Sequence, residues 1–243
     1  LNRAKVNDLK DFFIKWYGPN NATLTIGGDI SASEILPLVA KYFESIPKGP
    51  DIPAVNKKPV KLDADRYISI EDKIYLPLLG VSIPTTYGRT EDEAALDVLA
   101  EILGGNNNSI LFKNLVKTKT AVKVGVEHIC QELACKFTLY AVVAPEAVQS
   151  LAEIEKNIRN SLAEFEKRGV LESDLNKIKV KTESQAIREL QSVSSKVSWL
   201  AESETFTGNP NSFRNEITRY KNVTQADVMR VFNQYIKDKP AVI

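Results

Sequence analysis

His128, Cys130 and Cys135 are the residues of this chain whose types and close spacing could do metal or redox chemistry. An imidazole and two thiols are all zinc ligands, but these three lack a fourth partner and the spacing usual in zinc sites. The chain holds a single histidine, so no second imidazole can complete a metal site. We therefore expect His128 to be a surface or turn residue rather than a metal ligand or a base.

The two cysteines flank a four-residue turn between two segments with strand-like patterns. This spacing can place Cys130 and Cys135 opposite each other across a hairpin, which would allow a disulfide in an oxidising compartment. The alternative is a pair of small, half-buried thiols. The sequence leaves both interpretations open.

Asn107, Ser109, Lys113 and Lys123 are the candidate substrate-binding residues. The first two lie in a stretch of Gly and Asn residues before a short predicted helix, where backbone N–H groups could cradle an anion. The two lysines belong to a modest basic stretch that could meet a peptide carboxylate. Helix caps and solvated lysines explain the same residue types without any ligand.

Charge and composition exclude several classes of partner. Hydrophobic residues make up 43% of the 243 residues, which is enough for a sizeable core, and 32 Lys and Arg balance 31 Asp and Glu to a net charge of +1. A neutral chain has no bulk attraction to phosphate backbones or anionic lipid. No apolar run approaches the ~20 residues of a spanning helix. We expect no nucleic-acid partner and no membrane span.

From residue 67 onwards, most segments with strand-like patterns precede most segments with helical patterns. Alternating or apolar runs predict strands at residues 67–71, 74–83, 121–129 and 136–143, and three-or-four spacing predicts helices at 90–103, at 109–117 and through most of the chain after residue 150. Segregated strands and helices indicate an α+β fold of antiparallel sheets, each covered by helices on one face in two layers.

A helix, a Pro-containing turn and a strand occur twice, at residues 6–26, where the strand is expected at 22–26, and again at residues 228–243. Three apolar positions of the two copies fall in register, namely Leu9 with Val228, Phe13 with Phe232, and Trp16 with Tyr235. The second copy stops as its strand begins. We therefore expect the chain to be a piece of a longer protein.

Domain boundaries follow from the same repeat. Residues 1–46 are expected to be the C-terminal part of a preceding domain. They include a second predicted helix, which Ser31 and Glu34 begin as a capping box and which buries one face. Residues 47–66 carry four prolines and no apolar periodicity, which predicts a linker. Residues 67–243 are expected to form a second, nearly complete α+β domain.

Two parts of the chain resemble the pitrilysin and insulin-degrading-enzyme (insulinase) family of zinc metallopeptidases. They are residues 13–29 together with 41–47, where the motif reads FIKWYGPNNATLTIGGD and KYFESIP, and residues 103–116, which read LGGNNNSILFKNLV. The resemblance implies tandem homologous domains of the mitochondrial-processing-peptidase-like fold. In such proteins two halves close around an unfolded peptide.

The resemblance also implies where the zinc belongs. In that family an H-x-x-E-H helix and a downstream Glu hold the metal, and the Glu inside the motif activates its water. The motif is absent here, since Val124 stands where the first His of a motif ending at His128 would have to be. We expect no cofactor in this chain, zinc in the intact parent protein, and no activity of the chain alone.

The expected function is the non-catalytic portion, downstream of the zinc site, of a zinc metalloendopeptidase that degrades peptides in an enclosed chamber. Its expected partners are a peptide or unfolded polypeptide, the missing zinc-bearing domain and a second homologous half. The alternative is a structural, assembly or peptide-binding subunit of the same fold that never had a zinc site. The compartment stays open, with the bacterial periplasm or cell envelope as a first guess.

Overall fold

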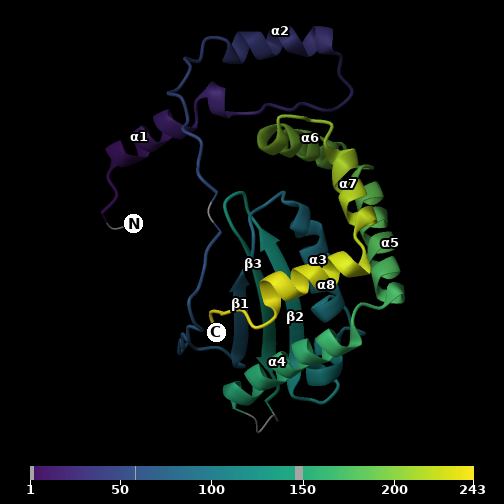
Figure 1. Cartoon of the computed structure of the whole chain (residues 1–243). Coiled ribbons are helices and arrows are strands. Elements are labelled where there is room, and N and C mark those ends of the chain that lie inside the picture. Colours follow the sequence, from purple (N-terminus) through teal and green to yellow (C-terminus); the bar gives the residue numbers. More distant parts are fainter. Residues whose placement is uncertain (1–2, 58, 146–149) are drawn as a thin grey trace. The chain divides into compact units, whose positions relative to one another are not determined.

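The computed structural model describes residues 3–57, 59–145 and 150–243 (Figure 1). Residues 1–2 of the predicted first segment and residue 58 of the predicted linker lie outside the described residues. The chain divides into two compact units, Leu1–Val55 with Ser184–Ile217, and Asn56–Glu183 with Thr218–Ile243. The predicted division at residues 46 and 66 concerns the domains of a parent protein, and it stays a prediction.

An antiparallel sheet forms the centre of the second unit, as the sequence predicts. It consists of β1 (Leu78–Pro84), β2 (Ala121–Cys130) and β3 (Cys135–Val143), in the order β1-β3-β2. Leu139 in the central strand pairs with Val81 on one side and with Val126 on the other. Residues 67–71 and 74–77, which were predicted as strand, lie outside these strands.

The last residues of the chain lie beside β1 and are joined to it by an isolated bridge. Val242 forms an antiparallel bridge with Ser82 of β1 and a parallel bridge with Arg66. The Val242 N–H donates to the Ser82 carbonyl at 2.9 Å, and the Ile243 N–H donates to the Arg66 carbonyl at 2.8 Å. The second copy of the repeat therefore ends in isolated bridges to β1 and to Arg66, and not in a full strand.

Helices cover one face of the sheet. α3 (Glu91–Gly104) packs against β2 and against α8 (Gln225–Val231), and α4 (Leu151–Arg168) packs against β1 and β3. Every second side chain of β3 is buried beneath them, which is the alternation expected of a sheet with one covered face. The predicted α+β class with helices on one face is confirmed.

The other helices largely follow the predicted pattern. The short helix expected at residues 109–117 contains a π-helical turn, η2 (Phe112–Val116), and a second π-helical turn, η3 (Phe232–Ile236), continues α8. The remaining helices of the second half are α5 (Glu172–Glu189), α6 (Val193–Thr207) and α7 (Phe213–Asn222).

The N-terminal segment departs from its prediction. It contains α1 (Val6–Trp16), the short turn η1 (Pro19–Asn21) and α2 (Ala32–Phe43), and no residue of either α-helix is buried. The predicted strand at residues 22–26 does not form, because a strand needs a neighbour for its backbone hydrogen bonds and no described segment pairs with it. The predicted buried face of α2 is likewise wrong, since Leu38 and Tyr42 are 49% and 64% exposed.

The predicted capping box at the start of α2 does not form. The Ser31 hydroxyl donates to Glu34 Oε2 at 2.8 Å, but the Ser31 side chain accepts no backbone N–H. The box is complete at α8, where Thr224 and Asp227 satisfy each other's backbone N–H groups.

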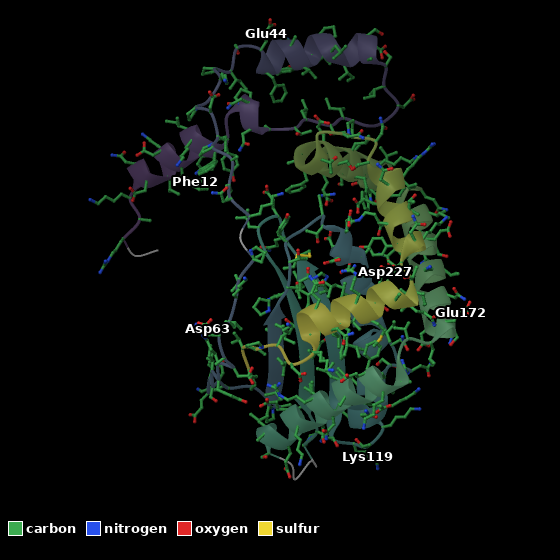
Figure 2. The ribbon with its side chains drawn as sticks, in the orientation of Figure 1. Phe12, Glu44, Asp63, Lys119, Glu172 and Asp227 are labelled. Atoms are coloured by element: carbon green, nitrogen blue, oxygen red, sulfur yellow. A yellow bond between two sulfur atoms is a disulfide. The ribbon has the colours of Figure 1, made fainter. Side chains whose placement is uncertain are left out.

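The two copies of the repeat differ in burial although their sequences match. In the second copy Val228 and Phe232 are 0% and 1% exposed, since they face the core of the sheet unit. Their counterparts in α1, Leu9 and Phe13, are 58% and 54% exposed. Phe12 on the same helix is exposed as well (Figure 2).

Candidate functional site

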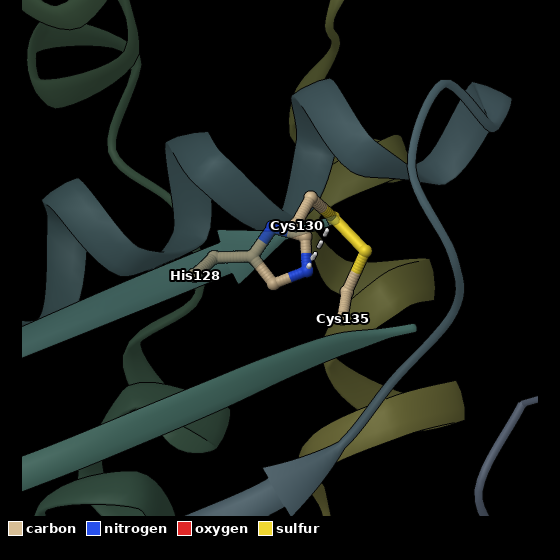
Figure 3. A group of neighbouring side chains, drawn as sticks. All are labelled: His128, Cys130 and Cys135. Atoms are coloured by element: carbon tan, nitrogen blue, oxygen red, sulfur yellow. Dashed lines mark hydrogen bonds between the residues drawn. A yellow bond between two sulfur atoms is a disulfide. The ribbon is translucent and has the colours of Figure 1, made fainter. Parts of the chain in front are cut away.

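The turn end of the β2–β3 hairpin brings together the three residues that the sequence singles out for metal or redox chemistry (Figure 3). Cys130 ends β2, Cys135 begins β3, and the strand register sets them opposite each other. They form a disulfide, which is one of the two alternatives that their spacing leaves open. The Cys130 Sγ lies 3.6 Å from His128 Nε2.

The side chain of His128 is fully buried, with 0% exposure, so the expectation of a surface histidine is wrong. Its Nδ1 lies 2.7 Å from Asp97 Oδ1 and its Nε2 lies 3.1 Å from the Thr85 hydroxyl. An ionised carboxylate can only accept, so Nδ1 carries the hydrogen and donates to Asp97. In the neutral ring Nε2 is then the acceptor, and its lone pair is on the side of Thr85 and the sulfurs.

Asp97 connects this imidazole to a second helix. The Tyr220 hydroxyl of α7 donates to Asp97 Oδ2 at 2.6 Å, so each carboxylate oxygen has one strong donor. Burial, and then the negative charge of Asp97, raise the pKa of Tyr220 well above its usual range. Tyr220 therefore stays a hydrogen-bond donor at physiological pH, and the cluster ties the end of the hairpin to α3 and α7.

Sequence reasoning missed Thr85, Asp97 and Tyr220. One signal was available for Asp97, which is a carboxylate between Leu96 and Val98 in a helix that is otherwise apolar at these positions. A charged residue beside the buried face of a helix calls for a partner. The partner itself lies 31 residues away, on a strand whose register cannot be derived from the sequence.

The four candidate substrate-binding residues do not form one site. Asn107 and Ser109 line a cavity of about 570 Å³, whereas Lys113 and Lys123 are exposed and are not among its lining residues. Its other walls come from the end of α3, the loop that follows it and the start of α5, namely Ile102, Asn106, Asn108, Asp174, Lys177 and Ile178. A role of Asn107, Ser109, Lys113 or Lys123 in substrate binding stays a prediction.

A second cavity, of about 500 Å³, adjoins the histidine cluster through Thr85. Tyr235 also lines it and donates to Asp92 Oδ2 at 2.7 Å. Burial, together with this hydrogen bond, raises the pKa of Tyr235 to about 12. The phenol is therefore neutral at any physiological pH.

The described residues provide one grouping of side chains that could hold a metal ion, which is His128 with Cys130 and Cys135. No described helix has the length and apolar character that crossing a bilayer requires.

Comparison with known proteins relates nearly the whole chain to one group. The family described as "Peptidase M16 inactive domain" matches residues 3–181. A curated relative, "Zinc protease PqqE" of Helicobacter pylori, is 25% identical over 236 residues, which is 96% of this chain and 53% of that protein. The chain thus spans about half the length of this relative.

Solved structures show the same fold. A crystal structure of a protease from Helicobacter pylori superposes with a TM-score of 0.86 at 24% identity, over 99% of this chain and 59% of the other. A peptidase M16 inactive domain from Pseudomonas fluorescens superposes with a TM-score of 0.82 at 18% identity, over 99% of this chain and 56% of the other. At these identities the likeness establishes the fold alone.

Proposed function

This chain belongs to the peptidase M16 inactive-domain family, and we propose that it is the non-catalytic portion, downstream of the zinc site, of a zinc metalloendopeptidase that degrades peptides in an enclosed chamber. The zinc and the residues that activate water then belong to a preceding domain, which packs against residues 1–46. The chain itself contributes wall and scaffold.

The unequal burial of the two repeats is the observation that carries this proposal. Val228 and Phe232 pack on a sheet, and the matching Leu9 and Phe13 of α1 have nothing comparable to pack on in the described residues. Burying one such side chain contributes about 1.5–3 kcal/mol. The helix α1 matches a core helix in sequence and yet is exposed. This is expected if the sheet domain against which it packs is missing.

The sheet offers a surface suited to an unfolded peptide. β2 lies at one end of the strand order and pairs only with β3 among the described strands. An edge strand can hold an extended peptide through backbone hydrogen bonds, without demanding a particular sequence. This property fits a peptidase that accepts varied peptides.

The test uses the complete polypeptide encoded by the gene, compared as wild type and as two variants of adjacent residues on α1. Leu9→Ser removes an apolar contact to the proposed zinc-bearing domain, and Lys10→Ser is the matched control on an exposed charged residue. We expect Leu9→Ser to lower the thermal stability and the zinc-dependent hydrolysis of a quenched fluorescent peptide, and Lys10→Ser to leave both near wild type.

Equal behaviour of the two variants would contradict the proposed packing. If the complete polypeptide holds no zinc and cleaves no peptide, the alternative of a structural, assembly or peptide-binding subunit takes the place of the proposed function.

A further inference from the structure

We propose that His128, Cys130 and Cys135 form a Zn²⁺ site that opens when their disulfide is reduced. The same three side chains would then hold either a covalent cross-link or a thiophilic cation, depending on redox conditions. This site lies in the chain itself, and it is independent of the peptidase function proposed for the parent protein.

The distances fit tetrahedral zinc. With Zn–N and Zn–S bonds of about 2.0 and 2.3 Å, a ligating nitrogen and sulfur lie about 3.5 Å apart. His128 Nε2 and Cys130 Sγ are already 3.6 Å apart. The ligand atoms of all three residues lie within 4.8 Å of one another. Two thiolates on one zinc lie about 3.8 Å apart, so the two sulfurs have to separate to about that distance once the disulfide is open.

The imidazole is already oriented as a metal ligand. Its Nδ1 donates to Asp97 at 2.7 Å, which leaves the Nε2 lone pair for the side where the sulfurs lie. A carboxylate behind the histidine is the usual second partner of zinc-bound imidazoles and raises their basicity. The Tyr220 hydroxyl fixes the other oxygen of Asp97 at 2.6 Å. The ring is fully buried and cannot easily turn away.

A water molecule can supply the fourth ligand. The Thr85 hydroxyl lies 3.1 Å from Nε2 and lines the cavity of about 500 Å³ described above. Three protein ligands and one water is the arrangement of open zinc sites. The sequence argued against a zinc site because a fourth protein ligand is missing. A water ligand removes this objection.

The chemistry balances with a reductant of either of two classes. A dithiol attacks one sulfur, forms a mixed disulfide and leaves as a cyclic disulfide, so that its two electrons and two protons end on Cys130 and Cys135. A phosphine attacks one sulfur and expels the other as a thiolate; water then cleaves the new phosphorus–sulfur bond, so that the phosphine leaves as its oxide and both cysteines are thiols. Zn²⁺ then binds the two thiolates and releases their protons.

The experiment titrates Co²⁺, which reports tetrahedral thiolate coordination by its colour, into the phosphine-reduced chain without oxygen. We expect one equivalent to give intense visible d–d bands and a thiolate-to-cobalt charge-transfer band, and Zn²⁺ to abolish both. The oxidised chain should give neither. Cys130→Ser should lose most of the charge-transfer intensity, and His128→Gln should lose the affinity while circular dichroism confirms that each variant is folded.

Asp97 and Tyr220 provide a graded second readout. Asp97→Asn removes the acceptor behind the imidazole and should weaken Co²⁺ binding by about 10–100-fold. Tyr220→Phe leaves the Asp97–His128 contact in place and should weaken Co²⁺ binding less than Asp97→Asn does. The proposal is overturned if the reduced, folded chain binds no more Co²⁺ than a Cys130→Ser/Cys135→Ser variant, or if His128→Gln binds as tightly as wild type. Neither outcome bears on peptide hydrolysis.

Discussion

Asp97 is the residue on which the buried polar cluster depends. It accepts from His128 and from Tyr220 at 2.7 and 2.6 Å, and its side chain is 29% exposed. In Asp97→Asn an NH₂ group replaces one carboxylate oxygen. One of the two donors, His128 or Tyr220, then faces another donor, and the other faces an amide oxygen, which is a weaker acceptor than a carboxylate. We expect the oxidised chain to lose about 1–3 kcal/mol in urea unfolding.

The control for this variant is Asp63→Asn, which removes a carboxylate from an exposed position of the same unit. It should change the unfolding free energy by less than about 0.5 kcal/mol. Equal unfolding curves for the two variants would show that the Asp97 hydrogen bonds contribute nothing to stability.

Asp227 makes the fold sensitive to acid. The Thr224 hydroxyl, and then the Thr224 backbone N–H, donate to its carboxylate and lower its pKa below the usual value of an aspartate. Because the folded pKa is depressed, this stabilisation is fully present above the unfolded pKa and is lost as the pH falls through the folded one. Asp227→Asn should therefore lower stability at pH 7 and show a shallower further loss below about pH 4 than wild type.

Thermal unfolding between neutral and acid pH checks this prediction. The variant and the wild type should converge as the pH drops below the folded pKa of Asp227. A constant difference in stability across that range would rule out the carboxylate as the cause.

At the residue scale the sequence indicated the hairpin and the facing cysteines but not the state of His128. Spacing reveals local pairs such as Cys130 and Cys135, which are five residues apart. The contact between His128 and Asp97 depends on how α3 lies over β2, and this is a property of tertiary packing.

Gly104 fixes how closely α3 approaches β2. A Cβ added there would lie 2.6 Å from the Val126 backbone nitrogen and 2.5 Å from a Val126 methyl. Because a backbone atom cannot move aside cheaply, Gly104→Ala should destabilise the chain by about 1–3 kcal/mol. The backbone here is not left-handed, so the glycine serves this close approach and not the C-cap conformation that its sequence context suggested.

Gly80 is the matched control, since a Cβ at this position in β1 meets nothing within 4 Å. Gly80→Ala should be neutral or slightly stabilising, because alanine reduces the entropy of the unfolded chain. Denaturant unfolding of both variants measures the difference. A Gly104→Ala variant as stable as Gly80→Ala would contradict the packing described for α3 and β2.

Elements with a partner within the chain were predictable from their periodicity, and elements without one were not. The hairpin of β2 and β3 and the helix α3 form close to their predicted bounds because their apolar faces bury each other. The strand expected at residues 22–26 and the buried face expected for α2 have correct patterns. They fail because a pattern predicts burial only where a surface exists to bury against.

For the molecule as a whole, the exposed apolar N-terminal segment is the feature on which the proposed scaffold role rests. The repeat was visible in the sequence, and so was the resemblance to zinc metallopeptidases. The grouping of residues 184–217 with the N-terminal segment was not visible, because compact units are defined by tertiary contacts and not by order along the chain.

The most direct test of the scaffold role is the hydrolysis of a quenched fluorescent peptide library by the isolated 243-residue chain with added Zn²⁺, in both its oxidised and its reduced state. We expect no cleavage above the rate in buffer in either state, because the sequence lacks the H-x-x-E-H motif whose Glu would activate a zinc-bound water. Turnover that requires Zn²⁺ and stops when a chelator is added would contradict it.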